Sequence, residues 1–178
     1  LWARVASAIP RADPAVRLGA RLLQRRDRWR EAVDVLIATD DEEGIVALVA
    51  RLAALEEPEV HTDDFAHVLA RAPAACLRSP DGDQLRSHTL LGVDGAGARA
   101  ALTDAAEGYA AAGNTNGERR CRTQLLWLQA WEEDVAAMSA TYERLQALAD
   151  AGDLGAQRTL DLSSAYLAQV SGDPARTA

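Results

Sequence analysis

Apolar residues recur along this chain with the spacing of one face of an α-helix. One stripe consists of Ile45, Leu48, Val49, Leu52 and Leu55, at i, i+3, i+4, i+7 and i+10. Two further stripes consist of Val135, Met138, Tyr142, Leu145 and Leu148, and of Ala98, Ala101, Leu102, Ala105, Ala106 and Tyr109. Residues 88–95 come nearest to the alternation of a strand, but that stretch is short. The pattern therefore predicts an all-α protein.

Capping residues divide these stripes into short helices. The expected N-terminal caps are Asp13 before Pro14, Thr39 in a capping box with Glu42, and Thr62 before the stripe of Phe65, Val68 and Leu69. Gly113 and Gly152 each follow an alanine-rich segment, where a left-handed residue ends a helix. The alanine-rich composition, with few aromatic residues, also favours helices, because alanine has the highest helix propensity.

The helices are expected to form pairs. First helices are predicted near 14–26, 41–56, 82–92, 117–131 and 154–170, and second helices near 28–38, 62–72, 95–112 and 133–150. The last partner is cut off after Asp173. First helices begin about 27 to 41 residues apart, which indicates a helix-pair repeat. We expect one helical-repeat domain over 1–178, a right-handed α-solenoid of antiparallel pairs, less regular in 1–92 and clearer in 93–178.

Charge and composition narrow the function. The net charge is −8, which argues against binding of a nucleic-acid backbone by this segment. All 19 basic residues are arginine, so neither a Schiff-base lysine nor a Walker A lysine is present. No apolar run has the length of a membrane span. Cys76 and Cys121 are expected to be reduced thiols in the cytoplasm. Because the chain starts at Leu1 and Met138 is its one methionine, we expect a fragment of a larger protein.

The stretch from Gly92 to Gly113 contains Gly95, Gly97 and Ala100 in the G-x-G-x-x-A spacing of a dinucleotide site. Such a site needs a strand before it and a second strand ending in an acid about 20 residues later. The residues after Gly113 are polar and basic instead. We interpret the glycines as a turn between two helices, and expect no cofactor.

Part of the chain resembles a known family. "ARLLQRRDRWREAVDVLIATDDEEGIVALVARL" is similar to helix pairs of STAND-class, LuxR-type bacterial transcriptional regulators and related actinobacterial antibiotic regulators. The shared pattern falls on 27–32, then on Ala38, Asp40 and Gly44. "DAAEGYAAAGNTNGERRCRTQLLWLQAW" and "LSSAYLAQVSGDPARTA" resemble tetratricopeptide repeats, with Asn114 where Asp is usual and Leu126 where a small residue is usual. The resemblance covers most of the chain outside 72–92.

The resemblance implies a sensor and interaction module between an ATPase switch and a DNA-binding domain. Its groove would hold a small-molecule inducer, a peptide or a sibling domain. In the tetratricopeptide register the groove-facing residues are Arg120, Thr123, Trp127 and Trp131. An arginine beside two tryptophans suits a carboxylate, a sugar or an aromatic side chain, whereas the alternative is that both tryptophans pack against the next repeat.

Other polar groups carry weaker signals. Arg119, Arg120 and Arg122 form either a solvated helix face or a surface for an acidic ligand or domain. His61, Asp64 and His67 have the wrong spacing for zinc on a helix. The alternative is an ordinary helix start, in which the acid complements the helix dipole and both histidines are exposed. His88 has no matching nucleophile in the sequence. We therefore expect no catalytic site and no metal.

We expect a non-enzymatic sensor or scaffold module of a bacterial transcriptional regulator. The alternative is a tetratricopeptide-type protein–protein adaptor unrelated to transcription. A homo-oligomer is compatible with either.

Overall fold

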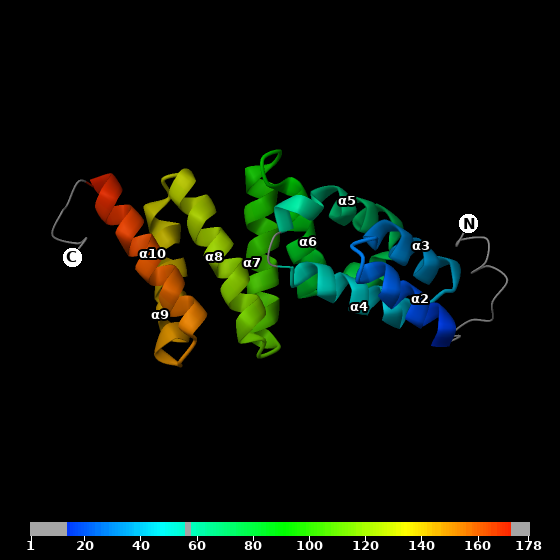
Figure 1. Ribbon diagram of the computed structural model, residues 1–178. Helices are drawn as coiled ribbons and strands as arrows, with labels where there is room; N and C mark the ends of the chain where they lie inside the picture. The colour runs from blue at the N-terminus through cyan, green and yellow to red at the C-terminus, as the bar shows by residue number, and fades with distance from the viewer. Residues whose placement is uncertain (1–13, 56–57, 172–178) are drawn as a thin grey trace. The chain divides into compact units, whose positions relative to one another are not determined.

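A computed structural model describes residues 14–55 and 58–171, and this part of the chain consists of helices without a strand (Figure 1). The α-helices are α2 Pro14–Gln24, α3 Trp29–Ala38, α4 Glu42–Ala53, α5 Thr62–Arg71, α6 Pro80–Leu90, α7 Gly95–Ala111, α8 Thr115–Trp131, α9 Val135–Asp150 and α10 Leu154–Ser171. Two short 3-10 helices, η1 Pro58–His61 and η2 Ala74–Leu77, lie between them. The prediction of an all-α protein is confirmed.

Each segment expected to be helical contains a helix, and the ends differ by only a few residues. The agreement follows from the spacing of apolar residues, since Ile45, Leu48, Val49 and Leu52 are all buried. The 3-10 helices were not expected. The Asp13 cap and the partner expected after Asp173 lie outside the described residues.

The chain divides into two compact units, Leu1–Ala105 and Ala106–Ala178, here called unit 1 and unit 2. The division falls inside α7. The sequence predicts one domain with a change in regularity at 92/93, a little before this division. Each unit is described below by itself.

Unit 1 encloses a core of large side chains. Helix α2 packs on α3, α3 packs on α4 and α5, and α6 packs on α4 and α5. The largest buried apolar side chains are Trp29, Leu36, Ile45, Leu48, Leu52, Phe65 and Leu85. The principal neighbours of α5 are α3 and α6, although the sequence paired it with the 41–56 helix. An apolar stripe requires that a helix be covered, but it does not specify which helix covers it.

Unit 2 has a smaller core between its last three helices. Helix α8 packs on α9, α9 packs on α10, and α10 also contacts α8. The buried apolar side chains between them are Leu126, Leu145, Leu148, Ala156 and Leu160. Met138, Tyr142 and Ala149 pack against this core while remaining only half-buried.

One local turn recurs between consecutive helices. A residue with positive φ follows the first helix, and the positions are Asp27 (54°), Asp40 (56°), Gly113 (70°), Glu133 (57°) and Gly152 (97°). The amide of the following residue donates to a carbonyl five positions back, as Asn114 does to Tyr109 at 2.9 Å and Asp153 to Leu148 at 3.0 Å. Such bonds satisfy carbonyls that the helix end would leave unpaired. The prediction of left-handed caps at Gly113 and Gly152 is confirmed.

At four of these junctions the residue after the positive-φ position also caps the next helix, whereas Arg28, which follows Asp27, makes no side-chain cap. These caps are Asp41, Asn114, Asp134 and Asp153, whose side chains accept hydrogen bonds from the amides of Gly44, Gly117, Ala137 and Ala156, respectively. A side-chain oxygen at this position satisfies one of the free amides at a helix start. The junction thus needs only a left-handed residue followed by Asp or Asn.

Two expected caps are wrong. Thr39 ends α3, where its hydroxyl donates to the carbonyls of Val35 and Leu36, while Asp41 caps α4. The capping box of Thr39 with Glu42 therefore does not form. The N-cap position of α5 is His61, and Thr62 is already the first helical residue.

The glycine-rich stretch joins two helices. Helix α6 ends at Leu90, Gly92 has a φ of 83°, and α7 begins at Gly95. The carboxylate of Asp94 accepts from the Gly97 amide at 2.9 Å, which caps α7. The interpretation as a turn between helices is therefore confirmed for Gly92, whereas Gly95 and Gly97 lie in the first turn of α7.

Candidate functional site

The four residues expected in a groove lie along α8 in different surroundings. Trp127 borders a pocket, and the Thr123 hydroxyl lies 3.2 Å from the Thr159 hydroxyl of α10. Trp131, at the end of α8, is 74% exposed. The Nε atom of Arg120 is buried and has no hydrogen-bond partner among the described residues. Of the four residues, Thr123 thus contacts α10, Trp127 lines the pocket and Trp131 faces solvent.

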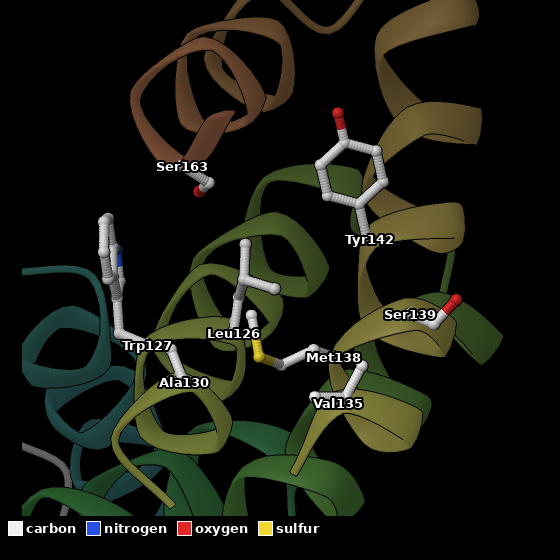
Figure 2. A pocket seen from close by; sticks show the side chains of 8 residues that line it. All are labelled: Leu126, Trp127, Ala130, Val135, Met138, Ser139, Tyr142 and Ser163. Atoms are coloured by element: carbon white, nitrogen blue, oxygen red, sulfur yellow. The ribbon is translucent and has the colours of Figure 1, made fainter. Parts of the chain in front are cut away.

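A pocket of about 260 Å³ opens between the three helices of unit 2. Its lining is almost entirely apolar and consists of Leu126, Trp127, Ala130, Val135, Met138, Ser139, Tyr142 and Ser163. In Figure 2, Trp127 and Tyr142 stand on opposite sides, with Leu126 and Met138 between them and Ser163 on the facing helix. Every wall comes from a different helix, because α8, α9 and α10 each contribute side chains.

The pocket results from an apolar stripe that the core does not fully cover. The α9 stripe begins at Val135 and ends at Leu148. Leu145 and Leu148 are buried, Met138 and Tyr142 are half-buried, and Val135 is 74% exposed. The first half of the stripe therefore lines the pocket, whereas its second half fills the core. Exposed apolar surface of this kind is typical of binding sites.

The hydroxyl groups at the pocket make defined hydrogen bonds. Ser163 is buried, and its hydroxyl donates to the Thr159 carbonyl at 2.7 Å. The Tyr142 hydroxyl lies 3.4 Å from the Ser164 hydroxyl of α10. Since the Ser163 proton is already donated, its oxygen remains able to accept a hydrogen bond.

Glu118, in the first turn of α8, is a buried carboxylate held by two arginines. Arg144 of α9 donates to it at 2.6 and 3.0 Å, and Arg122 donates at 2.8 Å. Burial favours the neutral acid, but the hydrogen bonds and charges of Arg144 and Arg122 outweigh it and hold the pKa of Glu118 below its ordinary value. The network ties the start of α8 to the middle of α9.

The arginine cluster on α8 is not a solvated face. The side chain of Arg122 is 18% exposed and pairs with Glu118, while that of Arg119 is 26% exposed. Arg119 lies 3.5 Å from the Asp153 carboxylate and donates to Asn116 at 2.6 Å. Both arginines are therefore committed to contacts within unit 2.

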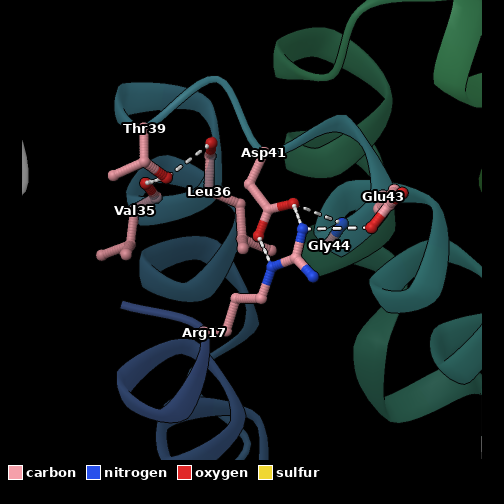
Figure 3. A network of polar contacts seen from close by, with 7 residues as sticks. All are labelled: Arg17, Val35, Leu36, Thr39, Asp41, Glu43 and Gly44. Carbon is pink, nitrogen blue, oxygen red and sulfur yellow. Dashed lines mark hydrogen bonds and ion pairs between the residues drawn. The ribbon is translucent and has the colours of Figure 1, made fainter. Parts of the chain in front are cut away.

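Unit 1 has a hollow of similar size but opposite chemistry. It measures about 250 Å³, and Arg17, Arg21, Gln24 and Glu43 are among its lining residues. Arg17 donates to both oxygens of Asp41, at 2.7 and 2.8 Å, and to Glu43 at 3.1 Å (Figure 3). These hydrogen bonds, that to Asp41 first, raise the pKa of Arg17. The charges of Arg17 and Glu43 are thus paired within the hollow, and Asp41 is also the cap of α4.

Two histidines of unit 1, His61 and His67, belong to the packing of α3 and α5, and the third, His88 of α6, is buried beside Phe65. His61 is half-buried against Trp29 and Phe65, with ring centroids 6.1 and 6.4 Å apart, so the expectation that it is exposed is wrong. Its Nδ1 lies 3.2 Å from Asp64. The Nε2 atom of His67 is instead 3.3 Å from Asp34 of α3. Over the described ranges, no three His, Cys, Asp or Glu side chains gather at a spacing suited to a metal ion.

Sequence reasoning missed most of the pocket. Trp127 was a candidate, but Met138, Tyr142 and Ser163 were not. Met138 and Tyr142 were assigned to a core-facing stripe, and only the arrangement of α10 reveals that the start of this stripe is left open. The sequence does contain one signal for the pocket. The apolar stripe extends from Val135 through Met138 and Tyr142 to Leu145 and Leu148, and it is longer than the small residues of the neighbouring helices can cover.

Comparison of the chain with protein-family models, curated proteins and solved structures finds no match. No helix in residues 14–55 and 58–171 combines the length and the apolar character of a membrane span.

Proposed function

We propose that this chain is a non-enzymatic binding module, acting as a cytoplasmic sensor or scaffold within a bacterial transcriptional regulator of the STAND-class, LuxR type. The resemblance of 20–52 to such regulators, and of 104–131 to tetratricopeptide repeats, supports the assignment. In this proposal the helix pairs form a right-handed tetratricopeptide-like solenoid, and its groove receives a small inducer, a peptide or a sibling domain.

The recurring junction supports the repeat. Four junctions use the same left-handed residue followed by an Asp or Asn cap, at 40–41, 113–114, 133–134 and 152–153. In unit 2 the same junction joins three successive helices that all contact one another. Repeats of this kind bury their apolar faces against their neighbours.

The observation that carries the proposal is the apolar pocket of unit 2. A molecule bound there touches α8, α9 and α10 together. A ligand shifts a conformational equilibrium only as far as it binds the two states differently. Because three helices share one pocket, its occupancy favours one arrangement of α10 against α8 and α9. That bias is the signal that an attached switch domain would receive.

Titration calorimetry tests the proposal with sugars, peptides and the domains encoded beside this segment. We expect one class to bind with saturable heat and to change the fluorescence of Trp127. The change should vanish in Trp127→Phe and persist in the matched control Trp131→Phe. Absence of heat with every class, together with unresponsive Trp127 fluorescence, contradicts the proposal.

A protein–protein adaptor is the second candidate. Trp131 and Val135, on either side of the α8–α9 junction, are each 74% exposed, and tryptophan is enriched in protein interfaces and among their energetically dominant residues. The coding sequence around the segment separates the candidates. A nucleotide-binding domain or a helix-turn-helix encoded beside the segment supports the regulator. If neither is encoded there, the adaptor is supported.

A further inference from the structure

The unit 2 pocket restricts the chemistry of what it can hold. We propose that it binds a neutral, flat aromatic molecule of one or two fused rings that carries a single hydrogen-bond donor. This inference rests on the proposed binding function and names the ligand class of the same pocket. Three features lead to it, namely size, charge and the placement of hydroxyl groups.

Size sets the scale of the ligand. A dry protein cavity of roughly 150 Å³ is enough to bind benzene. The unit 2 pocket, at about 260 Å³, is larger, so it has room for a fused pair of rings. Trp127 and Tyr142 stand at opposite sides (Figure 2), and aromatic walls favour a ring by stacked or edge-to-face contact.

Charge disfavours anionic ligands. Among the described residues that line the pocket there is no guanidinium or imidazole group. The arginines Arg122 and Arg144 are paired with Glu118. An anion placed in this lining would lose its water without gaining a partner, which is strongly unfavourable. The pocket therefore selects a neutral ring over an analogue that carries a carboxylate.

One hydroxyl selects a donor on the ligand. Ser163 is 4% exposed and lines the pocket, and its proton is donated to the Thr159 carbonyl. Its oxygen is consequently available as an acceptor. An indole N–H or a phenol O–H that reaches this oxygen gains a hydrogen bond, which a ligand without a donor does not.

Met138 makes the test direct, because it is the one methionine of the chain and it lines the pocket. Protein labelled with ¹³C-methyl methionine, released from a fusion so that no initiator methionine remains, gives a single methyl signal. Indole is the probe. We expect a saturable shift of the Met138 methyl, since the ring current of a neighbouring aromatic ring acts on it.

Two analogues test the chemistry, and two variants test the location. Binding of 1-methylindole, which lacks the donor, and of indole-3-acetate, which is charged, should each be at least about tenfold weaker than binding of indole. Ala130→Leu fills the pocket and should weaken indole binding about tenfold. The matched control Ala140→Leu, on an exposed α9 position outside the lining, should bind indole as the parent protein does.

Several results would overturn the inference. These are an unmoved Met138 methyl at saturating indole, equal affinity for indole-3-acetate, or equal indole affinity in Ala130→Leu and Ala140→Leu. A tryptophan-containing peptide or a flanking domain that shifts Met138 when indole does not removes the ligand class but leaves the proposed function standing. If no probe, peptide or domain shifts Met138 or releases heat, both fall together.

Discussion

The two units use tryptophan in opposite ways. Trp29 is 1% exposed in unit 1, packed edge-on to His61 and with the Arg51 guanidinium 5.6 Å above its ring. Trp127 in unit 2 borders a pocket instead. The core around Trp29 is therefore filled, and the hollow of unit 1 lies elsewhere, at Arg17 and Glu43. Trp127 instead forms part of the wall of an apolar pocket, and this contrast is the reason for assigning the proposed binding to unit 2.

The buried carboxylates of the units differ as well. Asp41 in unit 1 joins α2 to the start of α4 and also caps that helix. Glu118 in unit 2 has no capping role and is held by arginines from α8 and α9. In unit 1 a buried charge supports a turn, whereas in unit 2 it supports the packing of two helices that form pocket walls.

Replacement of tryptophan should separate the units most strongly. Trp29→Ala is expected to lower the free energy of unfolding by about 3–5 kcal/mol, because it leaves a cavity in a filled core. Trp127→Ala should cost less than about 2 kcal/mol, since this side chain already borders open space. Denaturant unfolding followed by circular dichroism measures both. The exposed Trp131→Ala is the control and should lie within about 0.5 kcal/mol of the parent. Equal costs at Trp29 and Trp127 would remove the contrast between the units.

Glu118→Gln should be the next largest effect. It leaves Arg122 and Arg144 without their shared carboxylate, and losing hydrogen bonds to a charged group is expected to cost about 2–3 kcal/mol. Unfolding of the variant is compared with that of Glu107→Gln, an exposed position where the change should lie within about 0.5 kcal/mol. If Glu118→Gln is as stable as its control, the network does not hold α8 to α9.

Acid should weaken unit 2 through the same carboxylate. The pKa of Glu118 is lower in the folded protein than its ordinary value, so the folded state favours the ionised form. This stabilisation is complete above the unfolded pKa of about 4.3 and is lost as the pH falls through the folded pKa. Unfolding measured between neutral pH and about pH 3 should therefore show a smaller loss in Glu118→Gln than in the parent. Parallel losses would show that Glu118 does not contribute.

The smallest expected effects concern the helix junctions. Gly152→Ala places a Cβ at a φ of 97° and should cost about 1 kcal/mol. Glu133→Gly relieves a side chain held at a φ of 57° and should raise the free energy of unfolding by a few tenths of a kcal/mol, up to about 1 kcal/mol. Thermal unfolding of both variants against the parent checks the opposite signs. A stabilising Gly152→Ala would mean that the junction does not require a left-handed residue there.

The sequence was a good guide to helices because helical stripes are local. Ile45 to Leu52 and Ala98 to Tyr109 are spaced for one face, and that face is buried. Gly113 and Gly152 marked helix ends for an equally local reason. Thr39 misled because a neighbouring carboxylate, Asp41, was the better cap and left the threonine hydroxyl to the preceding helix.

The tertiary features were harder to predict. The apolar stripe of α5 shows that one face of this helix is buried. It does not show which of the other helices packs on that face. The pairing of Glu118 with Arg144 could not be predicted, since the two residues are 26 positions apart. The pairing of Glu118 with Arg122 is local, because the two residues are four positions apart on one helix. Trp127 was identified as a candidate, but the pocket around it requires α9 and α10 in place.

The helix junctions have a consequence for how such a chain can change its length. Each of the four junctions satisfies its own backbone groups within a few residues, with a left-handed residue on one side and a capping oxygen on the other. Excision or duplication of the segment between two junctions would rejoin equivalent turns. It would leave no backbone amide or carbonyl of the junction without a hydrogen-bond partner. The obstacle to gaining or losing a helix pair would then be the match between side chains on the newly adjoining faces, and point mutations can adjust that match gradually.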